Sequence, residues 1–100
     1  MFVIIFTHLR PLAEVDKLRE AHFAHIDRHY ADGLFLLSGR REPRNGAVIL
    51  AGGESREAVE AAVSSDPFIA AGVASCEIVA FLPGRASEGL RFLLPHGGAA

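Results

Sequence analysis

The chain has 100 residues and a formal net charge of −2 at pH 7, with 10 lysine and arginine residues against 12 acidic ones. This length suits one domain with one core, and the charge excludes the long-range attraction that a phosphate backbone needs, so no nucleic acid partner is expected. Half of the residues are hydrophobic, which is rich for a monomer of this size and favours an oligomer with a shared apolar surface.

The N-terminal part of the chain is predicted to form two strands around a long helix. Residues 2–6 (FVIIF) are apolar and rich in β-branched side chains, which is typical of a central strand covered on both faces. Pro11 suits a first helical turn, and a helix is predicted over residues 12–31. Gly33 ends this helix at its C′ position, and residues 34–38 (LFLLS) form the second strand.

The middle of the chain is predicted to form a hairpin connection and a second helix. Residues 39–46 (GRREPRNG) are typical of an exposed loop, in which the pair Asn45-Gly46 is the strongest turn signal. A third strand follows over residues 47–51 (AVILA). Ser55 is the expected N-cap of a helix over residues 56–64.

The rest of the chain is predicted to add a short turn, a last strand and a tail. Asp66 and Pro67 form a second helix start, with the aspartate as cap and the proline at the first position. A fourth strand is predicted over residues 73–82 (VASCEIVAFL). The tail that follows Pro83 contains a short predicted helix over residues 87–93.

The element order βαββαβ predicts an α+β fold of the ferredoxin-like class. In this sandwich a four-stranded antiparallel sheet carries both helices on one face. The other face would be bare, and the predicted strands are too apolar to meet water there. We therefore expect a homodimer formed through the sheet face, in the manner of a dimeric α+β barrel.

Two features bear on where the protein works. The N-terminal segment MFVIIF lacks a basic n-region and is too short to be a signal peptide or a membrane span, so no membrane association is expected. The single cysteine, Cys76, excludes an internal disulfide and suits a reducing compartment. A cytoplasmic location is therefore expected.

His22 is the first candidate for chemistry, because it lies at the centre of the apolar stripe of the predicted helix. At 100° per residue, five residues fall within an arc of about 80° on this side: Val15, Leu18, His22, Ile26 and His29. An imidazole buried there without a partner costs about 1–3 kcal/mol. His22 would therefore serve either as a core residue whose ring is hydrogen-bonded or as a general acid and base, since imidazole exchanges a proton near neutral pH.

Asp66 is the candidate partner of His22. A catalytic histidine usually needs a carboxylate that fixes its tautomer and stabilises the imidazolium. The simpler interpretation of Asp66 is that it only caps the helical turn that begins at Pro67. Both interpretations remain open at this point.

A metal site is the second candidate, since His22, His25 and His29 share one side of the helix. No acidic residue stands at ligand spacing on that side, and no cysteine supports it. The spacing also matches no known zinc signature. No metal is therefore expected, and the absence of nucleotide-binding motifs leaves no cofactor expected either.

The end of the second strand is the third candidate. Ser38 would orient a small ligand by hydrogen bonding, and Gly39 would let the ligand approach the backbone closely, although Ser-Gly is also ordinary turn chemistry. The adjacent basic residues Arg40, Arg41 and Arg44 are typical of a solvated loop tip, and one of them is a candidate contact for an anionic substrate.

The chain resembles the YCII-related (YciI-like) family. The resemblance is carried by short motifs in a fixed order over residues 1–82: residues 19–26 (REAHFAHI), Asp32-Gly33, residues 37–39 (LSG), residues 66–68 (DPF) and Gly72-Val73. It implies a ferredoxin-like dimer over residues 1–83, with residues 84–100 as a C-terminal extension. The sequence departs from the family pattern at Arg40, where the family has a proline after Ser-Gly.

The resemblance also implies an activity. His22 and Asp66 match a histidine–aspartate pair that is proposed to be the family's acid/base dyad. Members with an assigned reaction act without a cofactor on small chlorinated or hydroxylated aromatic or lactone compounds. The leading hypothesis is therefore an isomerase or a lyase of the dehalogenase type, in which Ser38, Gly39 and Arg19 bind the small-molecule ligand.

Two other functions are weighed against this hypothesis. One is a non-catalytic module that binds a metabolite or a partner protein, with His22 only completing the core. The other is a cofactor-free monooxygenase of the dimeric α+β-barrel type, which would need a larger cavity lined by aromatic or polar residues. One tyrosine and no tryptophan give little sign of such a lining.

Overall fold

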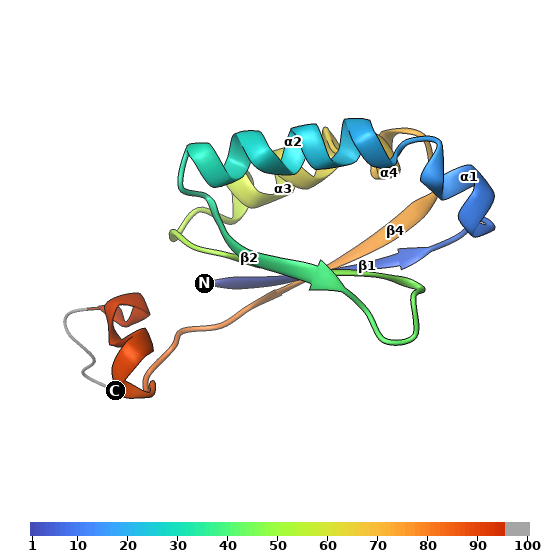
Figure 1. Cartoon of the computed structure of the whole chain (residues 1–100). Coiled ribbons are helices and arrows are strands. Elements are labelled where there is room, and N and C mark those ends of the chain that lie inside the picture. The colour runs from blue at the N-terminus through green and yellow to red at the C-terminus, as the bar shows by residue number, and fades with distance from the viewer. Residues whose placement is uncertain (96–100) are drawn as a thin grey trace.

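The computed structural model describes residues 1–95, which form a four-stranded antiparallel sheet with helices on one of its faces (Figure 1). The helices and strands in chain order are β1 (Phe2–His8), α1 (Leu12–Asp16), α2 (Arg19–Ala31), β2 (Phe35–Arg40), β3 (Gly46–Ala51), α3 (Arg56–Ser64), α4 (Pro67–Ala70), β4 (Ala74–Ala80) and the 3-10 helix η1 (Glu88–Leu93). None of the helices in this part of the chain is long and apolar enough to cross a membrane.

The strand order in the sheet is β2-β3-β1-β4. The central strand β1 pairs antiparallel with β3 on one side and with β4 on the other, so that Ile4 lies opposite Ile49 and Ile78. The order and the antiparallel pairing are those of the ferredoxin-like α+β sandwich, and the predicted fold class is confirmed.

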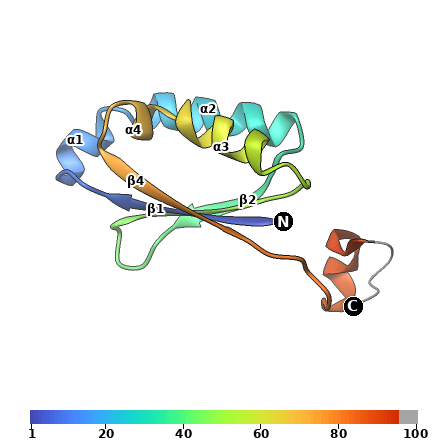
Figure 2. The same cartoon turned by 180° about the vertical axis from the view of Figure 1, so that it is seen from behind.

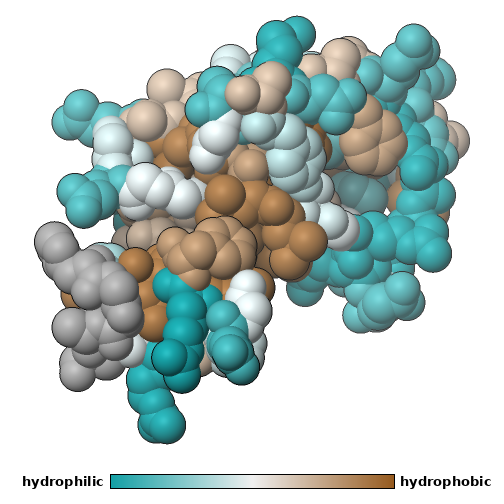
Figure 3. Space-filling model, turned by 60° about the vertical axis from the view of Figure 1, so that its left-hand side comes forward, coloured by the Kyte–Doolittle hydropathy of each residue, from teal (hydrophilic) through white to brown (hydrophobic). Residues whose placement is uncertain are grey.

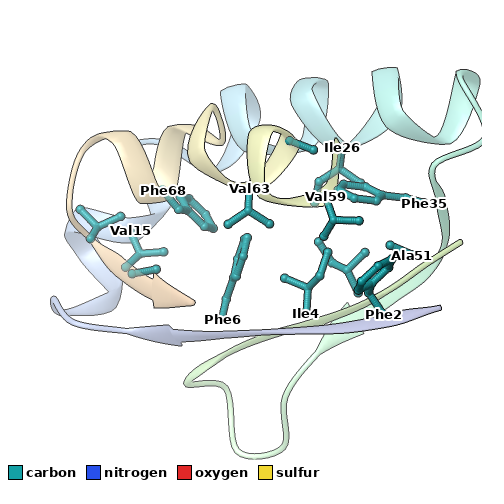
Figure 4. Close-up of a cluster of buried hydrophobic side chains, with 14 residues drawn as sticks. Phe2, Ile4, Phe6, Val15, Ile26, Phe35, Ala51, Val59, Val63 and Phe68 are labelled. Atoms are coloured by element: carbon teal, nitrogen blue, oxygen red, sulfur yellow. The ribbon is translucent and has the colours of Figure 1, made fainter. Parts of the chain in front are cut away.

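The core lies between the sheet and the helices. Alternate side chains of β1 (Phe2, Ile4 and Phe6) are almost fully buried, and they rise from the strand towards α3 and α4 (Figure 4). Val59 and Val63 on α3 meet them from the helix layer. Each large apolar side chain buried in this way stabilises the fold by about 1.5–3 kcal/mol. The two-residue period of β1 therefore sets which of its side chains face the helices.

The helix predicted over residues 12–31 is wrong in one respect, because it is two helices. The helix is interrupted at Lys17 and Leu18, and Leu18 has φ −104° and ψ 1° instead of helical values. A straight helix of this length would be about 30 Å long, whereas a seven-residue strand spans about 23 Å. The break lets α1 bend towards the end of the sheet (Figure 1), and Val15 stays buried there.

The predicted helix ends and turns are found with small shifts. Gly33 follows α2 with φ 85°, and the hydroxyl of Ser55 accepts a hydrogen bond from the amide of Ala58 at the start of α3. The hairpin loop is present, but Gly46 is the first residue of β3 and not part of the turn. A Cβ atom at Gly46 would lie 1.8 Å from the carbonyl oxygen of Phe6, so close packing between strands explains this glycine.

The face of the sheet away from the helices carries a row of apolar side chains. The register places Leu37, Leu50, Val3 and Val79 side by side across the four strands on this face. Leu37 is 66% exposed and Val79 is 43% exposed in the single chain. On the side of the molecule that lies at the left in Figure 1, apolar side chains also gather in the middle, with hydrophilic side chains around them (Figure 3).

The segment after β4 leads away from the sheet. The amide of Phe81 donates to the carbonyl oxygen of Met1, which places the start of this segment beside the first residue of β1. From there the chain runs to η1, which lies off the end of the sheet, on the side away from the helices (Figures 1 and 2). None of the residues of η1 is buried.

Candidate functional site

The imidazole of His22 and the carboxylate of Asp66 form a buried pair between α2 and α4. The Nδ1 atom of His22 lies 2.8 Å from Oδ2 and 2.9 Å from Oδ1 of Asp66. His22 is 3% exposed and Asp66 is 1% exposed. The structure therefore brings these two sequence-predicted residues together, although they are 44 positions apart.

The start of α4 fixes the orientation of Asp66. Its Oδ1 atom accepts a hydrogen bond of 2.8 Å from the amide of Phe68, and Pro67 occupies the first helical position. Asp66 is thus both a helix cap and the partner of His22. A short connection between α3 and α4 presents the carboxylate to α2 because the cap residue itself lies at the point where the chain turns.

The pair fixes the tautomer of His22. A carboxylate only accepts hydrogen bonds, so the Nδ1 atom must carry the hydrogen that it donates to Asp66. The neutral ring then has its lone pair on Nε2. Within residues 1–95 no hydrogen bond to Nε2 is found, and His22 borders a cavity. This nitrogen is the atom of the pair that is able to take a proton from a ligand.

Phenylalanine rings hold the imidazole in place. The ring of Phe68 is stacked on it, with centroids 3.9 Å apart and an interplanar angle of 9°. Phe6 and Phe23 lie tilted against it at centroid distances of 6.0 Å and 5.6 Å. These contacts leave the ring little freedom to rotate, which is the condition for a positioned acid or base.

The cavity at His22, named the His22 cavity below, has a volume of about 370 Å³. It lies between the helices α1 and α2 and the ends of β1, β2 and β3. Seven of its lining residues carry polar side chains: His8, Asp16, Arg19, His22, Ser38, Arg40 and Arg44. Gly39 adds open backbone. All of the predicted ligand-binding residues therefore line it together with His22, while Asp66 lies behind the ring.

The hydroxyl of Ser38 is held by a neighbour from the helix layer. Its Oγ atom is hydrogen-bonded to the hydroxyl of Tyr30, near the end of α2. The next residue, Gly39, has open space where a side chain would be, since no atom lies within 4 Å of an added Cβ. The end of β2 thus offers the cavity a positioned hydroxyl and an accessible backbone.

Arginine side chains supply most of the charge around the cavity. Arg44 lies 2.6 Å from the carboxylate of Asp16, and the guanidinium of Arg19 lies over the ring of Phe23 at 5.3 Å. Arg40 makes no ion pair within residues 1–95. The loop that was expected to be a solvated tip therefore places two of its arginines against the cavity.

His8 is a cavity residue that the sequence reasoning missed. Burial lowers the pKa of His8 below its ordinary value of 6.5, and the nearby charge of Arg44 lowers it further. The signal was present in the sequence, because His8 continues the two-residue period of Phe2, Ile4 and Phe6. A strand extended by two residues would have placed it on the helix-facing side.

The other histidines of α2 have separate partners. The Nε2 atom of His25 lies 2.7 Å from the carbonyl oxygen of Ala62, which ties α2 to α3. The Nδ1 atom of His29 lies 3.0 Å from the carboxylate of Asp32 at the end of the helix. In the part of the chain that the structure describes, no three histidine, cysteine or acidic side chains are grouped so as to hold a metal ion.

Comparison with solved structures found a similar fold. A complex of 5-chloro-2-hydroxyhydroquinone dehydrochlorinase (TftG) from Burkholderia phenoliruptrix AC1100 with 2,5-dihydroxybenzoquinone superposes with a TM-score of 0.67. The match covers 81% of this chain and 93% of that chain at 22% sequence identity, a level that establishes the fold alone. No curated protein matches the chain in sequence.

Comparison with protein families gave one assignment. The model of the YCII-related domain matches residues 1–82, which contain every strand of the sheet and both members of the His22–Asp66 pair. The resemblance inferred from the short sequence motifs is thereby confirmed. The chain belongs to the YCII-related domain family.

Proposed function

We propose that the protein is a cofactor-independent enzyme that binds a small cyclic organic compound in the His22 cavity and moves a proton on it. The observation that carries this proposal is the orientation of His22, whose Nδ1 is held by Asp66 while its ring borders the cavity. The similarity in fold to a dehydrochlorinase that was crystallised with a quinone ligand supports the same class of substrate.

In the proposed reaction, Nε2 of His22 takes a proton from a carbon or oxygen atom of the substrate. The electron pair left behind forms a new double bond. In an elimination, halide departs with the electrons of its bond to carbon, and the imidazolium later releases the proton to water. In an isomerisation, the imidazolium returns the proton to a different atom. Asp66 stabilises the imidazolium, and such acid/base catalysis contributes about 10²- to 10⁴-fold.

The other cavity residues are proposed to bind the substrate. The hydroxyl of Ser38 hydrogen-bonds a substrate oxygen, and Gly39 leaves room for the substrate against β2. Arg19 adds a positive charge, and its contact with Phe23 keeps the guanidinium at the mouth of the cavity. These roles agree with the mixed lining of small-molecule sites, in which a few polar groups stand among apolar walls.

We also propose a homodimer that is formed through the uncovered sheet face. The row of Leu37, Leu50, Val3 and Val79 gives this face a continuous apolar strip, and such strips mark interfaces between subunits. A second copy packed sheet against sheet would remove it from water. This arrangement leaves the His22 cavity accessible, because the cavity lies on the opposite side of the sheet.

The enzymatic proposal is tested with 5-chloro-2-hydroxyhydroquinone and with small chlorinated lactones as substrates. His22→Ala should lower turnover by at least about 100-fold while the folded protein still binds 2,5-dihydroxybenzoquinone. His29→Ala is the matched control on the same helix, and we expect it to keep full activity. If the wild type binds these compounds without turning them over, the cavity belongs to a binding module and the proposal is wrong. If His22→Ala turns them over as the wild type does, His22 is not the acid/base and the proposal is wrong as well.

A further inference from the structure

The charges that line the His22 cavity are unusual for this chain. The protein as a whole has a formal net charge of −2, yet the charged side chains on the cavity wall are three arginines and one aspartate: Arg19, Arg40, Arg44 and Asp16. The single aspartate is already paired with Arg44. The cavity therefore has an excess positive charge that favours an anionic ligand.

Arg40 differs from the two other arginines that follow β2, Arg41 and Arg44, because no side chain is found to hold its guanidinium in the described part of the chain. Arg41 donates a hydrogen bond of 2.8 Å to the hydroxyl of Thr7, and Arg44 is held by Asp16. For Arg40, no side-chain hydrogen bond and no ion pair is found within the described part of the chain. Its guanidinium is thus available to the cavity that it lines.

The register of β2 directs Arg40 towards the same space as Ser38. Ser38 lies opposite Ile49 and Arg40 lies opposite Ala47, so the two side chains are two residues apart on the helix-facing side of the strand. His22 enters the cavity from the helix layer. A ligand held by Arg40 on the sheet wall would therefore present its other end to the imidazole.

We propose that Arg40 determines substrate specificity by binding a carboxylate group on a single-ring substrate. The planar guanidinium donates two parallel hydrogen bonds that match a carboxylate. A cavity of about 370 Å³ is near the lower end of the range for ligand sites and suits one substituted ring. The substrate class is thus a hydroxylated aromatic or cyclic carboxylate. This inference rests on the proposed function for the chemistry, but not for the binding of the acid.

The test compares the binding of 2,5-dihydroxybenzoate with that of its neutral amide by isothermal titration calorimetry. The wild type should prefer the acid by at least about tenfold, with the preference weakening as salt is added. Arg40→Gln should weaken the binding of the acid by about 10- to 100-fold and leave the amide unchanged. Arg40→Lys keeps the charge but loses the planar fork, so it should restore only part of the affinity.

Arg41→Gln is the matched control, because it removes the same charge from a neighbouring residue that does not line the cavity. We expect this variant to bind the acid with an affinity within about twofold of that of the wild type. Equal affinity for acid and amide, or an Arg40→Gln variant that binds the acid normally, would overturn the inference. Stronger competition by inorganic phosphate than by the acid would also overturn it, because the ligand group would then be a phosphate.

Measuring both binding and turnover of the His22→Ala and Arg40→Gln variants separates this inference from the proposed function. His22→Ala should bind the acid with nearly wild-type affinity, because His22 is proposed to act on the ring and not on the carboxylate. If His22→Ala keeps full turnover while Arg40→Gln loses the acid, the proposed chemistry fails and the carboxylate site stands. If His22→Ala abolishes turnover while Arg40→Gln binds normally, the chemistry stands and the carboxylate site fails.

Discussion

The Nδ1 atom of His22 lies within 2.9 Å of both carboxylate oxygens of Asp66, and the same carboxylate caps α4 through the amide of Phe68. One buried side chain therefore ends the α3–α4 connection and sets the tautomer of the ring across from it. Removing the carboxylate should affect both the stability of the fold and the chemistry of His22, and the two effects are separable by choice of substitution.

Asp66→Ala should lower the free energy of unfolding by about 2–4 kcal/mol. The loss combines about 1 kcal/mol for the helix cap with about 1–3 kcal/mol for an imidazole left without its buried partner. Asp66→Asn keeps an oxygen for the Phe68 amide and should cost only about 1 kcal/mol, yet its amide would reverse the tautomer of His22 and abolish turnover. Urea unfolding midpoints and turnover rates measure the two effects, and equal midpoints for Asp66→Ala and the wild type would contradict the prediction.

The titration of His8 should be displaced to lower pH. Its folded pKa lies below 6.5 because of burial and the charge of Arg44, so the unfolded chain takes up the proton first as the pH falls. The fold should therefore lose stability as the pH drops below about 7 towards the folded pKa, and His8 contributes nothing above that window. An NMR titration of the His8 ring gives the midpoint directly.

Arg44→Gln provides the control for His8. This substitution removes the nearby cation but leaves the ring partly buried, so the midpoint should rise towards 6.5. A wild-type midpoint at or above 6.5 would show that His8 is better solvated than the structure indicates.

The thiol of Cys76 should react slowly in the folded protein. Burial raises its pKa to about 11, and the charges of Asp66 and Glu77 contribute. Because the thiolate is the reactive form, a rise from 9.0 to about 11 should slow the reaction with a disulfide reagent about 100-fold at pH 8. Comparing the rates in buffer and in urea tests this, and similar rates in both would count against it.

Gly46→Ala should destabilise the fold by about 3 kcal/mol or prevent folding. Its Cβ would lie 1.8 Å from the carbonyl oxygen of Phe6, and both groups belong to the paired backbones of β1 and β3. Gly39→Ala, which meets nothing within 4 Å, is the matched control and should stay within about 1 kcal/mol of the wild type. Thermal unfolding of both variants would decide, and equal stability would show that the strands separate easily.

The proposed dimer makes a prediction about mass in solution. Multi-angle light scattering should give twice the chain mass of 10.7 kDa, and Val79→Glu should reduce it to a single chain by placing a charge in the apolar row. Ala58→Glu adds the same charge on the exposed side of α3 and should leave the dimer intact. A wild type that elutes at the mass of one chain at high concentration would exclude the dimer.

Much of the fold follows from local signals in the sequence. Ser55 and Asp66 begin helices because their side chains accept the first free amides, and Gly33 ends one because it adopts positive φ. The apolar runs give the four strands, and the order of elements leaves few ways to arrange them. These features depend on neighbours within a few residues, so the sequence alone predicts them.

Other features depend on distances across the fold and could not be read from the sequence. The break at Leu18 arises because the helix is longer than the strand that it covers, a comparison that needs both elements in place. Whether Asp66 only caps α4 or also meets His22 depends on how α4 packs against α2. The path of one loop gives Arg41 and Arg44 their partners and leaves Arg40 without one among the described residues.

The His22 cavity has two walls with separate origins. The pair that would do the chemistry belongs entirely to the helix layer, whereas Ser38 and Arg40 lie at the end of β2, beside the loop that joins β2 to β3. Exchanging the hairpin would alter which molecules are accepted while the reactive ring keeps its support. Diversification within such a scaffold can therefore proceed by substitutions in this loop and at the adjoining strand end, and a designer can graft new loops there in the same way.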